Sequence, residues 1–271
     1  VDGLIVELTK QALRPLPIFV SSLKDPLSAS VLSETLAVAP PQVILNATGF
    51  SVSKPGGDRT ITPLDSHQVP VLQVVFAGSN QDSWKSGTRG LSARDIAMNV
   101  ALPEVDGRVL SRAVSFKAET HFDTKTQSSI VAYEPVANRI HFTAKLAAGW
   151  VRLANTEPKM RRIALVLANY PNRDGRMGNG VGLDSPAAAA GMLKSLAAAG
   201  YFIENAPVDG NQLVERLKAG PTNAYDNIRT ATEVLELENY NAFFVKLPQT
   251  VKDQVTEKWG SPETDPFFLE D

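Results

Sequence analysis

The sequence predicts an α/β fold, with parallel-sheet βαβ units in two consecutive subdomains joined by a long helix. Short β-rich runs alternate with helical patterns through most of the chain, which is typical of parallel sheets with crossover helices. One helical pattern is much longer than the others, and the strand pattern restarts after it. A chain of 271 residues with 43% hydrophobic and 21% charged residues has the length and composition of a globular protein with about two domains.

The first subdomain is predicted over residues 1–157. Asp25 and Pro26 suit the N-cap and N1 positions of a helix that runs to about Ala37. A second helix is expected over residues 92–100, after a polar loop. Short apolar runs predict three strands, at residues 16–20, 43–45 and 71–76.

A long helix and a polar stretch separate the two predicted subdomains. The apolar positions between Glu134 and Ala154 keep helical spacing for about five turns, which predicts the longest helix of the chain. The polar residues 155–161 follow it, and the strand pattern then returns. We therefore expect the boundary near this stretch, with the second subdomain over residues 158–271.

The second subdomain is expected to repeat the alternation of strands and helices. Ser185 as N-cap, Pro186 at N1 and Gly200 at C′ bracket one helix. A shorter helix is expected between Asp209 and Gly220. Strands are predicted at residues 163–167 and 201–203.

Composition and simple patterns exclude several classes of function. A net charge of −2 and a pI near 6.0 provide no basic field for a phosphate backbone, so no nucleic-acid partner is expected. The absence of cysteine excludes disulfides, thiolate metal sites and cysteine nucleophiles. No phosphate-binding P-loop occurs, so we expect no nucleotide cofactor in this chain, and any ATP must be hydrolysed by another chain.

The sequence also lacks the signals of membrane insertion or export. No apolar run reaches the roughly 18 residues of a membrane span, and the first residues do not form a signal peptide, so a cytoplasmic location is expected. Because the chain begins at Val1 rather than Met, we expect a segment of a longer protein.

A glycine-rich segment over residues 169–184 is the first candidate site. It follows a predicted strand and precedes a helix, the place where open α/β sheets bind ligands. Four glycines allow a close backbone approach, and Arg173 and Arg176 offer fork-shaped donors that suit carboxylates. The alternative is a long surface loop with no ligand.

The second candidate lies in residues 100–108. In an extended segment Glu104, Asp106 and Arg108 would share one face, which could hold a carboxylate pair and a cation. A carboxylate beside an apolar run can accept a proton or bind a hard metal ion. The alternative is a plain turn made by Pro103, Asp106 and Gly107. His67 lies near an aspartate in a polar loop and is a weaker metal-ligand candidate.

Two long motifs, VALPEVDGRVLSRAVSFK and NYPNRDGRMGNGVGLDSP, resemble the large subunits of ATP-dependent (aerobic) cobaltochelatase and of magnesium chelatase. The resemblance extends over nearly the whole chain, and it implies an internal fragment of a multisubunit enzyme. The family's activity is insertion of Co²⁺ into hydrogenobyrinic acid a,c-diamide in cobalamin biosynthesis, or of Mg²⁺ into protoporphyrin IX. Separate AAA+ subunits hydrolyse the ATP. The loop sequence DGRMGNGVGLD favours the cobalt branch.

The resemblance also assigns expected roles to the candidate residues. Glu104 and Asp106 are the expected catalytic carboxylates, with Glu104 also a metal ligand. The expected tetrapyrrole-binding residues are Arg108, Arg173, Arg176 and Asn179. The alternative is a module without catalytic chemistry that binds a tetrapyrrole or docks the ATPase subunits.

Overall fold

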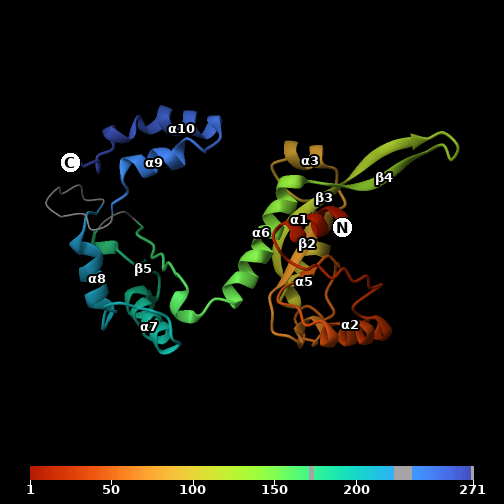
Figure 1. The fold of residues 1–271 in the computed structure, drawn as a ribbon, viewed down its shortest axis with the longest axis horizontal. Helices are drawn as coiled ribbons and strands as arrows, with labels where there is room; N and C mark the ends of the chain where they lie inside the picture. The colour runs from red at the N-terminus through yellow and green to blue at the C-terminus, as the bar shows by residue number, and fades with distance from the viewer. Residues whose placement is uncertain (171–173, 223–233, 270–271) are drawn as a thin grey trace. The chain divides into compact units, whose positions relative to one another are not determined.

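The computed structural model describes residues 1–170, 174–222 and 234–269, and the backbone divides into two compact units. The first unit is Val1–Thr156 and the second is Glu157–Asp271. Figure 1 labels their helices and strands. Each unit is described by itself below.

The first unit is built around a four-stranded sheet in the order β1-β2-β3-β4. The strands are β1 (Ile44–Asn46), β2 (Val71–Ala77), β3 (Val109–Asp123) and β4 (Ser128–Pro135). β1 pairs with β2, and β2 with β3, in parallel, whereas β3 and β4 are antiparallel. The helical elements of this unit are α1 (Asp2–Lys10), α2 (Pro26–Val38), η1 (Pro63–Asp65), α3 (Gln81–Ser86), α4 (Ala93–Ile96), η2 (Ala97–Ala101), α5 (Leu102–Val105) and α6 (Ala137–Ala154). The predicted α/β class is confirmed.

Alternating side chains of β2 anchor the two faces of the sheet. Leu72 and Val74 point toward α1 and α6, where Leu8, Ile140 and Ala144 are buried with them. Val75 and Ala77 point to the opposite face and pack with Phe116 and with the partly buried Trp84 and Val100. Because both faces of β2 are covered, the strand is apolar on both sides, as is usual for parallel strands.

The helix predicted over 92–100 is longer than expected and changes its winding. Ser92 caps α4, and the helix continues through the π-helical η2 into α5, ending at Val105. Pro103 cannot donate a backbone hydrogen bond to Asn99, and its ring would clash with that carbonyl in a regular α-helix. The wider π turn directly before Pro103 is consistent with this constraint.

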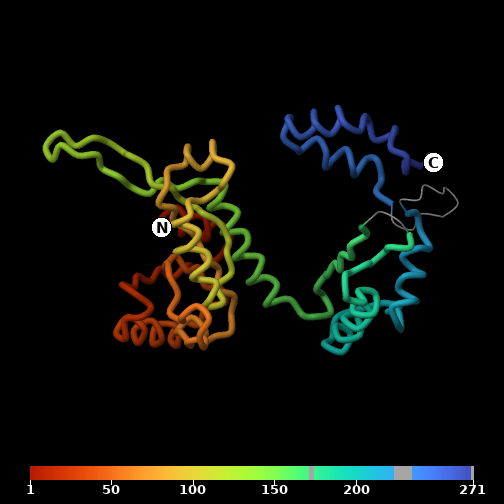
Figure 2. The backbone as a smooth tube through the Cα atoms, turned by 180° about the vertical axis from the view of Figure 1, so that it is seen from behind, coloured from red at the N-terminus to blue at the C-terminus, as the bar shows by residue number. Residues whose placement is uncertain are grey.

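The β3–β4 hairpin extends beyond the other elements of the first unit (Figures 1 and 2). Every residue of β4 is exposed. The long-helix prediction began too early, because Glu134 and Pro135 belong to β4 and α6 begins at Ala137. The strand predicted at 16–20 was also wrong, since these residues form no ladder.

The second unit is mainly helical in its described residues. Its elements are η3 (Pro158–Met160), η4 (Asp174–Arg176), β5 (Asn179–Gly180), β6 (Leu183–Asp184), α7 (Ser185–Ala198), α8 (Gly210–Ala219), α9 (Leu237–Phe244), α10 (Gln249–Trp259) and η5 (Pro262–Thr264). The helix predicted between Asp209 and Gly220 is confirmed as α8. The cap of α7 is Asp184 rather than Ser185, because the Asp184 carboxylate accepts the Ala187 N–H. Residues 163–167 and 201–203 belong to no strand, so both strand predictions were wrong for this structure.

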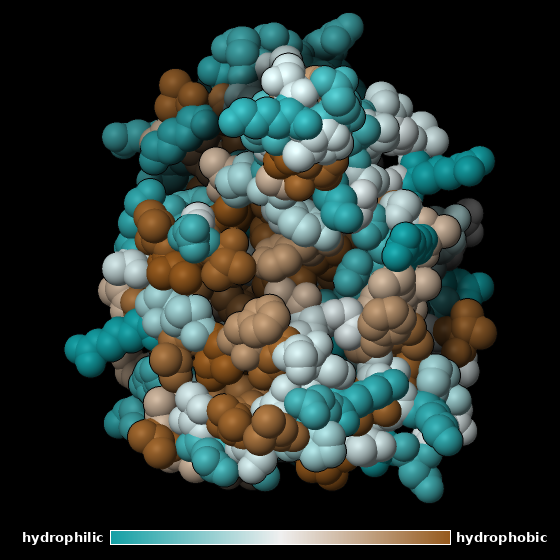
Figure 3. Space-filling model, turned by 90° about the vertical axis from the view of Figure 1, so that its right-hand side faces the viewer, coloured by the Kyte–Doolittle hydropathy of each residue, from teal (hydrophilic) through white to brown (hydrophobic). Residues whose placement is uncertain are grey.

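The two units differ in how much apolar surface they bury. The first unit contains four clusters of buried hydrophobic residues, whereas Ala189 and Ala190 are the buried hydrophobic residues of the second unit's described part. Apolar side chains also gather on the molecular face shown in Figure 3. Among the described helices, none combines the length and hydropathy needed to cross a membrane.

Candidate functional site

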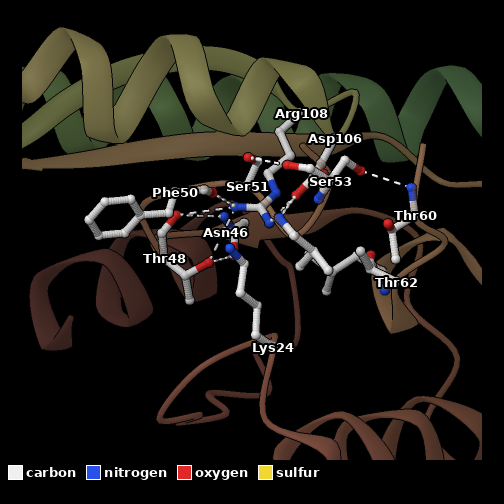
Figure 4. A network of polar contacts seen from close by, with 12 residues as sticks. Lys24, Asn46, Thr48, Phe50, Ser51, Ser53, Thr60, Thr62, Asp106 and Arg108 are labelled. Carbon is white, nitrogen blue, oxygen red and sulfur yellow. Dashed lines mark hydrogen bonds and ion pairs between the residues drawn. The ribbon is translucent and has the colours of Figure 1, made fainter. Parts of the chain in front are cut away.

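Asp106 lies in the turn that joins α5 to β3. Gly107 follows it with a φ of +75°, a conformation that favours glycine and reverses the chain direction. The Asp106 carboxylate accepts the backbone N–H groups of Val52 (2.7 Å) and Ser53 (3.0 Å), which come from the loop after β1. Hydrogen bonds therefore join the turn to a loop more than fifty residues away in the sequence (Figure 4).

Arg108 completes this buried contact. Its Nη2 donates to Asp106 at 2.9 Å, and its Nη1 donates to the carbonyl oxygens of Thr48 (3.3 Å) and Phe50 (3.2 Å). Both charged side chains are only 2% exposed. The guanidinium group therefore ties the start of β3 to residues 48–50.

Burial and hydrogen bonding act in opposite directions on the Asp106 carboxyl. Burial alone would raise the pKa of Asp106, but the N–H groups of Val52 and Ser53 and the positive charge of Arg108 hold it below its usual value. Burial lowers the pKa of Arg108 below its usual value, and the neighbouring Asp106 opposes this effect. An arginine stays protonated in proteins, so the two form an ion pair at neutral pH.

The donors and acceptors of Asp106 and Arg108 are directed into the protein chain. This arrangement agrees with the alternative of a turn that stabilises the fold, which the sequence pattern left open. A catalytic role for Asp106 and a substrate-binding role for Arg108 stay predictions.

Glu104 lies apart from this pair. Residues 102–105 are helical, so the argument that Glu104, Asp106 and Arg108 share one face of an extended segment was wrong. The Glu104 side chain is exposed on α5. It is the accessible carboxylate of the motif and lies next to the turn that Asp106 and Arg108 hold.

A buried amide pair extends the network into the sheet. Asn46 at the end of β1 donates to the Gln73 side chain of β2 at 2.7 Å, and Gln73 donates to the Thr48 carbonyl at 3.0 Å. Sequence reasoning missed both residues. The available signal was a polar residue within each of two otherwise apolar strands, VILN and VLQVVF.

Asp95 was also missed, and it organises the carboxyl end of β2. Its carboxylate accepts the Gly78 N–H at 2.9 Å and the Ser92 hydroxyl at 2.8 Å. The Phe50 N–H donates to the Met98 carbonyl at 2.7 Å, which brings the loop after β1 to the π-helical turn. Small and polar residues therefore meet at the sheet edge where α/β folds place ligands.

A cavity of about 400 Å³ lies at the opposite edge, where β2 and β3 begin. The residues that line it are Arg59, Ile61, Thr62, Leu64, Asp65, Gln68, Val69, Pro70, Val71, Asp106, Gly107, Arg108 and Val109. Arg59 forms an ion pair with Asp65, and Asp65 also accepts the Thr62 N–H at 2.8 Å. These contacts close one wall of the cavity.

Within the part of the chain that the structure describes, no metal site forms around His67. Its Nδ1 contacts the Ser66 hydroxyl at 2.8 Å. Among the described residues, no group of three histidine, aspartate or glutamate side chains is placed to hold a metal ion. The proposed metal-ligand role of His67 therefore has no supporting neighbours in that part of the chain.

The glycine-rich loop forms a small hairpin before α7. β5 and β6 pair around a turn in which Gly182 has a φ of +75°. A Cβ at Gly180 would lie only 2.7 Å from the Ser185 hydroxyl oxygen. The left-handed backbone at Gly182 therefore favours glycine with or without a ligand, and the close contact at Gly180 leaves little room for a side chain. Arg176 and Asn179 are exposed on this loop, and Arg173 lies outside the described residues.

The chain is similar along its whole length to proteins of the chelatase class. The sequence model of the family described as CobN/Magnesium Chelatase matches residues 1–271, so the chain belongs to this family.

Particular relatives lie in the cobalt branch. The chain is 52% identical to the aerobic cobaltochelatase subunit CobN of Sinorhizobium sp, over 100% of this chain and 21% of the relative. It is 40% identical to the subunit of the same name from Pseudomonas aeruginosa, over 96% of this chain and 21% of the relative. The chain thus spans about a fifth of the length of these curated relatives.

A solved structure supports the same grouping. The chain matches the catalytic subunit of cobaltochelatase from Mycobacterium tuberculosis with a TM-score of 0.75 and 28% identity. The match covers 98% of this chain and 22% of that structure. The magnesium-chelatase subunit ChlH of rice is a more distant relative, at 22% identity over 96% of this chain.

Proposed function

We propose that this chain is a segment of the large subunit of an aerobic cobaltochelatase. The whole subunit would bind hydrogenobyrinic acid a,c-diamide and insert Co²⁺ into it during cobalamin biosynthesis. The 52% identity along the full length of the chain carries this proposal. Separate AAA+ subunits would hydrolyse ATP, and the complex would work in the cytoplasm.

Glu104 is the residue that we assign to the chemistry. Metal insertion removes inner N–H protons from the macrocycle and strips water from the metal ion, and an accessible carboxylate can assist both steps. Glu104 is exposed, while Asp106 and Arg108 hold the turn that follows it. We therefore assign positioning to the buried pair and contact with substrate or metal to Glu104.

Arg176 and Asn179 are assigned to holding the acids and amides at the edge of the tetrapyrrole. Both are exposed on the hairpin before α7, and guanidinium groups form strong charge-assisted hydrogen bonds with carboxylates. Arg173 belongs to the same loop sequence and is assigned the same role.

Replacing Glu104 in the full-length subunit tests the proposal. With the ATPase subunits, Co²⁺ and corrinoid present, we expect Glu104→Gln to lower the rate of insertion by at least about tenfold, as for loss of a general base. Glu238→Gln is the matched control, since Glu238 is also an exposed glutamate in the first turn of a helix. Equal rates for both variants and the wild type would reject the role of Glu104.

A binding module without catalytic chemistry is the second candidate function. The inward-facing contacts of Asp106 and Arg108 favour it, because they commit the polar atoms of two expected site residues to partners within the chain. Under this alternative Glu104→Gln retains both pigment affinity and turnover.

A magnesium chelatase acting on protoporphyrin IX is less favoured, since the relatives of that name are 22–24% identical. Comparing corrinoid with porphyrin in a binding titration separates the two pigments.

A further inference from the structure

Two apolar segments of the second unit have no strand partner among the described residues. Residues 163–167 and 201–203 were expected to be strands from their sequence, and both lie outside every helix and strand that the structure describes. Among the described contacts, no backbone hydrogen bond involves residues 163–167, whereas the Ala168 carbonyl that follows accepts the Gly178 N–H at 3.0 Å. Backbone groups of apolar segments are normally paired in a finished fold.

The first segment has the composition of a central strand. The run IALVL places apolar side chains on both of its faces, which is typical of parallel strands covered on both sides. In this structure Val166 is 91% exposed, and Ile163 on the other face is 51% exposed. The sequence pattern predicts that both faces of this segment are buried, but both are exposed in the structure.

The two segments begin side by side. The Arg161 guanidinium donates to the Tyr201 hydroxyl at 2.8 Å and lies 5.6 Å from the centre of its ring. Pro158 lies against Gly200. Since α7 connects the two segments, they have the strand–helix–strand order of a parallel crossover but lack its ladder.

We propose that these segments are two strands of a parallel sheet that an extended segment of the same subunit completes. That segment would lie outside residues 1–271, in the part of the polypeptide to which this chain has no counterpart. The chain spans only 21% of the Sinorhizobium relative, so the relatives contain ample further sequence. This inference rests on the proposed function only in taking the chain to be part of such a large subunit.

The added strand would also complete the candidate binding loop. The described residues 174–184 lead into α7 and follow the first segment in the sequence, and ligands of open parallel sheets bind at the carboxyl end of the strands. The incoming strand would provide the neighbouring wall. The loop with Arg176 is therefore only one side of the site.

Amide hydrogen exchange in the full-length subunit tests the pairing directly. We expect the amides of residues 164–167 and 202–203 to exchange at least about a hundredfold more slowly than in an unpaired chain. Exchange at the unpaired rate would overturn the proposal. The measurement needs neither cobalt nor turnover, so its failure is distinct from failure of the proposed activity.

Photo-cross-linking in the same subunit identifies the segment that packs on residues 163–167. A benzophenone amino acid in place of Val166 is expected to form a cross-link with a peptide from outside residues 1–271. Val38, which is 88% exposed at the end of α2, is the matched position for comparison. A cross-link from position 166 only to peptides within residues 1–271, or none, would overturn the assignment to an outside segment.

Discussion

At the residue scale, the buried ion pair of Asp106 and Arg108 joins the start of β3 to the loop after β1. Each side chain compensates for the burial of the other, and their remaining bonds hold the loop after β1. Removing one partner leaves a buried charge without compensation. We therefore expect Arg108→Ala to lower the free energy of unfolding by about 3–5 kcal/mol.

Urea denaturation of the full-length subunit measures this loss. Arg94→Ala is the control, because Arg94 is exposed on α4 and contacts only the Met98 sulfur among its described partners. In the double variant with Asp106→Ala, the loss should be smaller than the sum of the single losses. Additive losses would show that the pair does not act as a unit.

The lowered pKa of Asp106 predicts a pH dependence. Folding favours its ionised form, so the contribution to stability is present above the unfolded pKa of about 3.9 and is lost as pH falls through the lower folded value. We expect the unfolding free energy of the wild type to decline below about pH 4, and Asp106→Asn to reduce that slope. Urea midpoints at a series of acidic pH values test it, and identical slopes would contradict it.

Arg176 provides the residue-scale test of the binding loop. If it holds an acidic group of the pigment, Arg176→Ala should weaken affinity by about ten- to a hundredfold while the protein stays folded. Absorbance titration with corrinoid measures the change. Arg89→Ala, at an exposed position in the first unit, should leave affinity unchanged. Wild-type affinity in both variants would show that the loop serves the fold alone.

At the scale of elements, the backbone requirement at Gly182 predicts a difference between two glycines of one loop. Gly182 has a φ of +75°, so Gly182→Ala should cost about 1–2 kcal/mol in unfolding free energy. Gly175 does not have a positive φ, and a Cβ there would meet no neighbour within 4 Å, so Gly175→Ala should be nearly neutral. Thermal unfolding compares the two, and equal shifts would contradict the assignment.

Elements with strong local signals were predicted correctly from the sequence. Asp25 and Pro26 mark the start of α2, and the apolar run of β2 is closed by Gly78. The segment at 16–20 failed for an identifiable reason, because Pro15 and Pro17 remove N–H groups that a ladder needs. The β3–β4 hairpin was missed because its distal part is exposed on both faces and so carries no alternation of apolar and polar residues.

The site was less predictable than the elements because its bonds are long-range. The pattern around Glu104 suggested an extended segment, but the helix continues to Val105 and turns at Gly107. Asp106 and Arg108 find their partners in residues 48–53, which no local spacing reveals. The role of Glu104 itself stays a prediction.

At the scale of the whole molecule, the two units bury different amounts of apolar surface, which predicts that they differ in their ability to fold alone. The first unit buries apolar residues on both sides of its sheet, whereas the described part of the second unit buries two alanines. Burial of apolar surface is the main favourable term in folding, at about 25 cal/mol per Å². We expect residues 1–156 alone to unfold cooperatively on heating and residues 157–271 alone to lack a cooperative transition.

Calorimetry of the two separate segments measures this difference. A sharp transition in the segment 157–271 would show that its described surface is sufficient for stability. The same result would weaken the argument that it needs a strand from elsewhere in the polypeptide. Absence of a transition in residues 1–156 would contradict the assignment of a self-sufficient core.

The exposed β3–β4 hairpin has a consequence for handling the protein in solution. A strand such as β4, exposed along its full length at the edge of a sheet, presents unpaired backbone groups to any neighbouring molecule. Phe122 and Val131 add exposed apolar area to the β3–β4 hairpin. Two copies of the isolated chain can therefore pair edge to edge as concentration rises, and shortening the hairpin at residues 119–131 would remove much of this exposed edge.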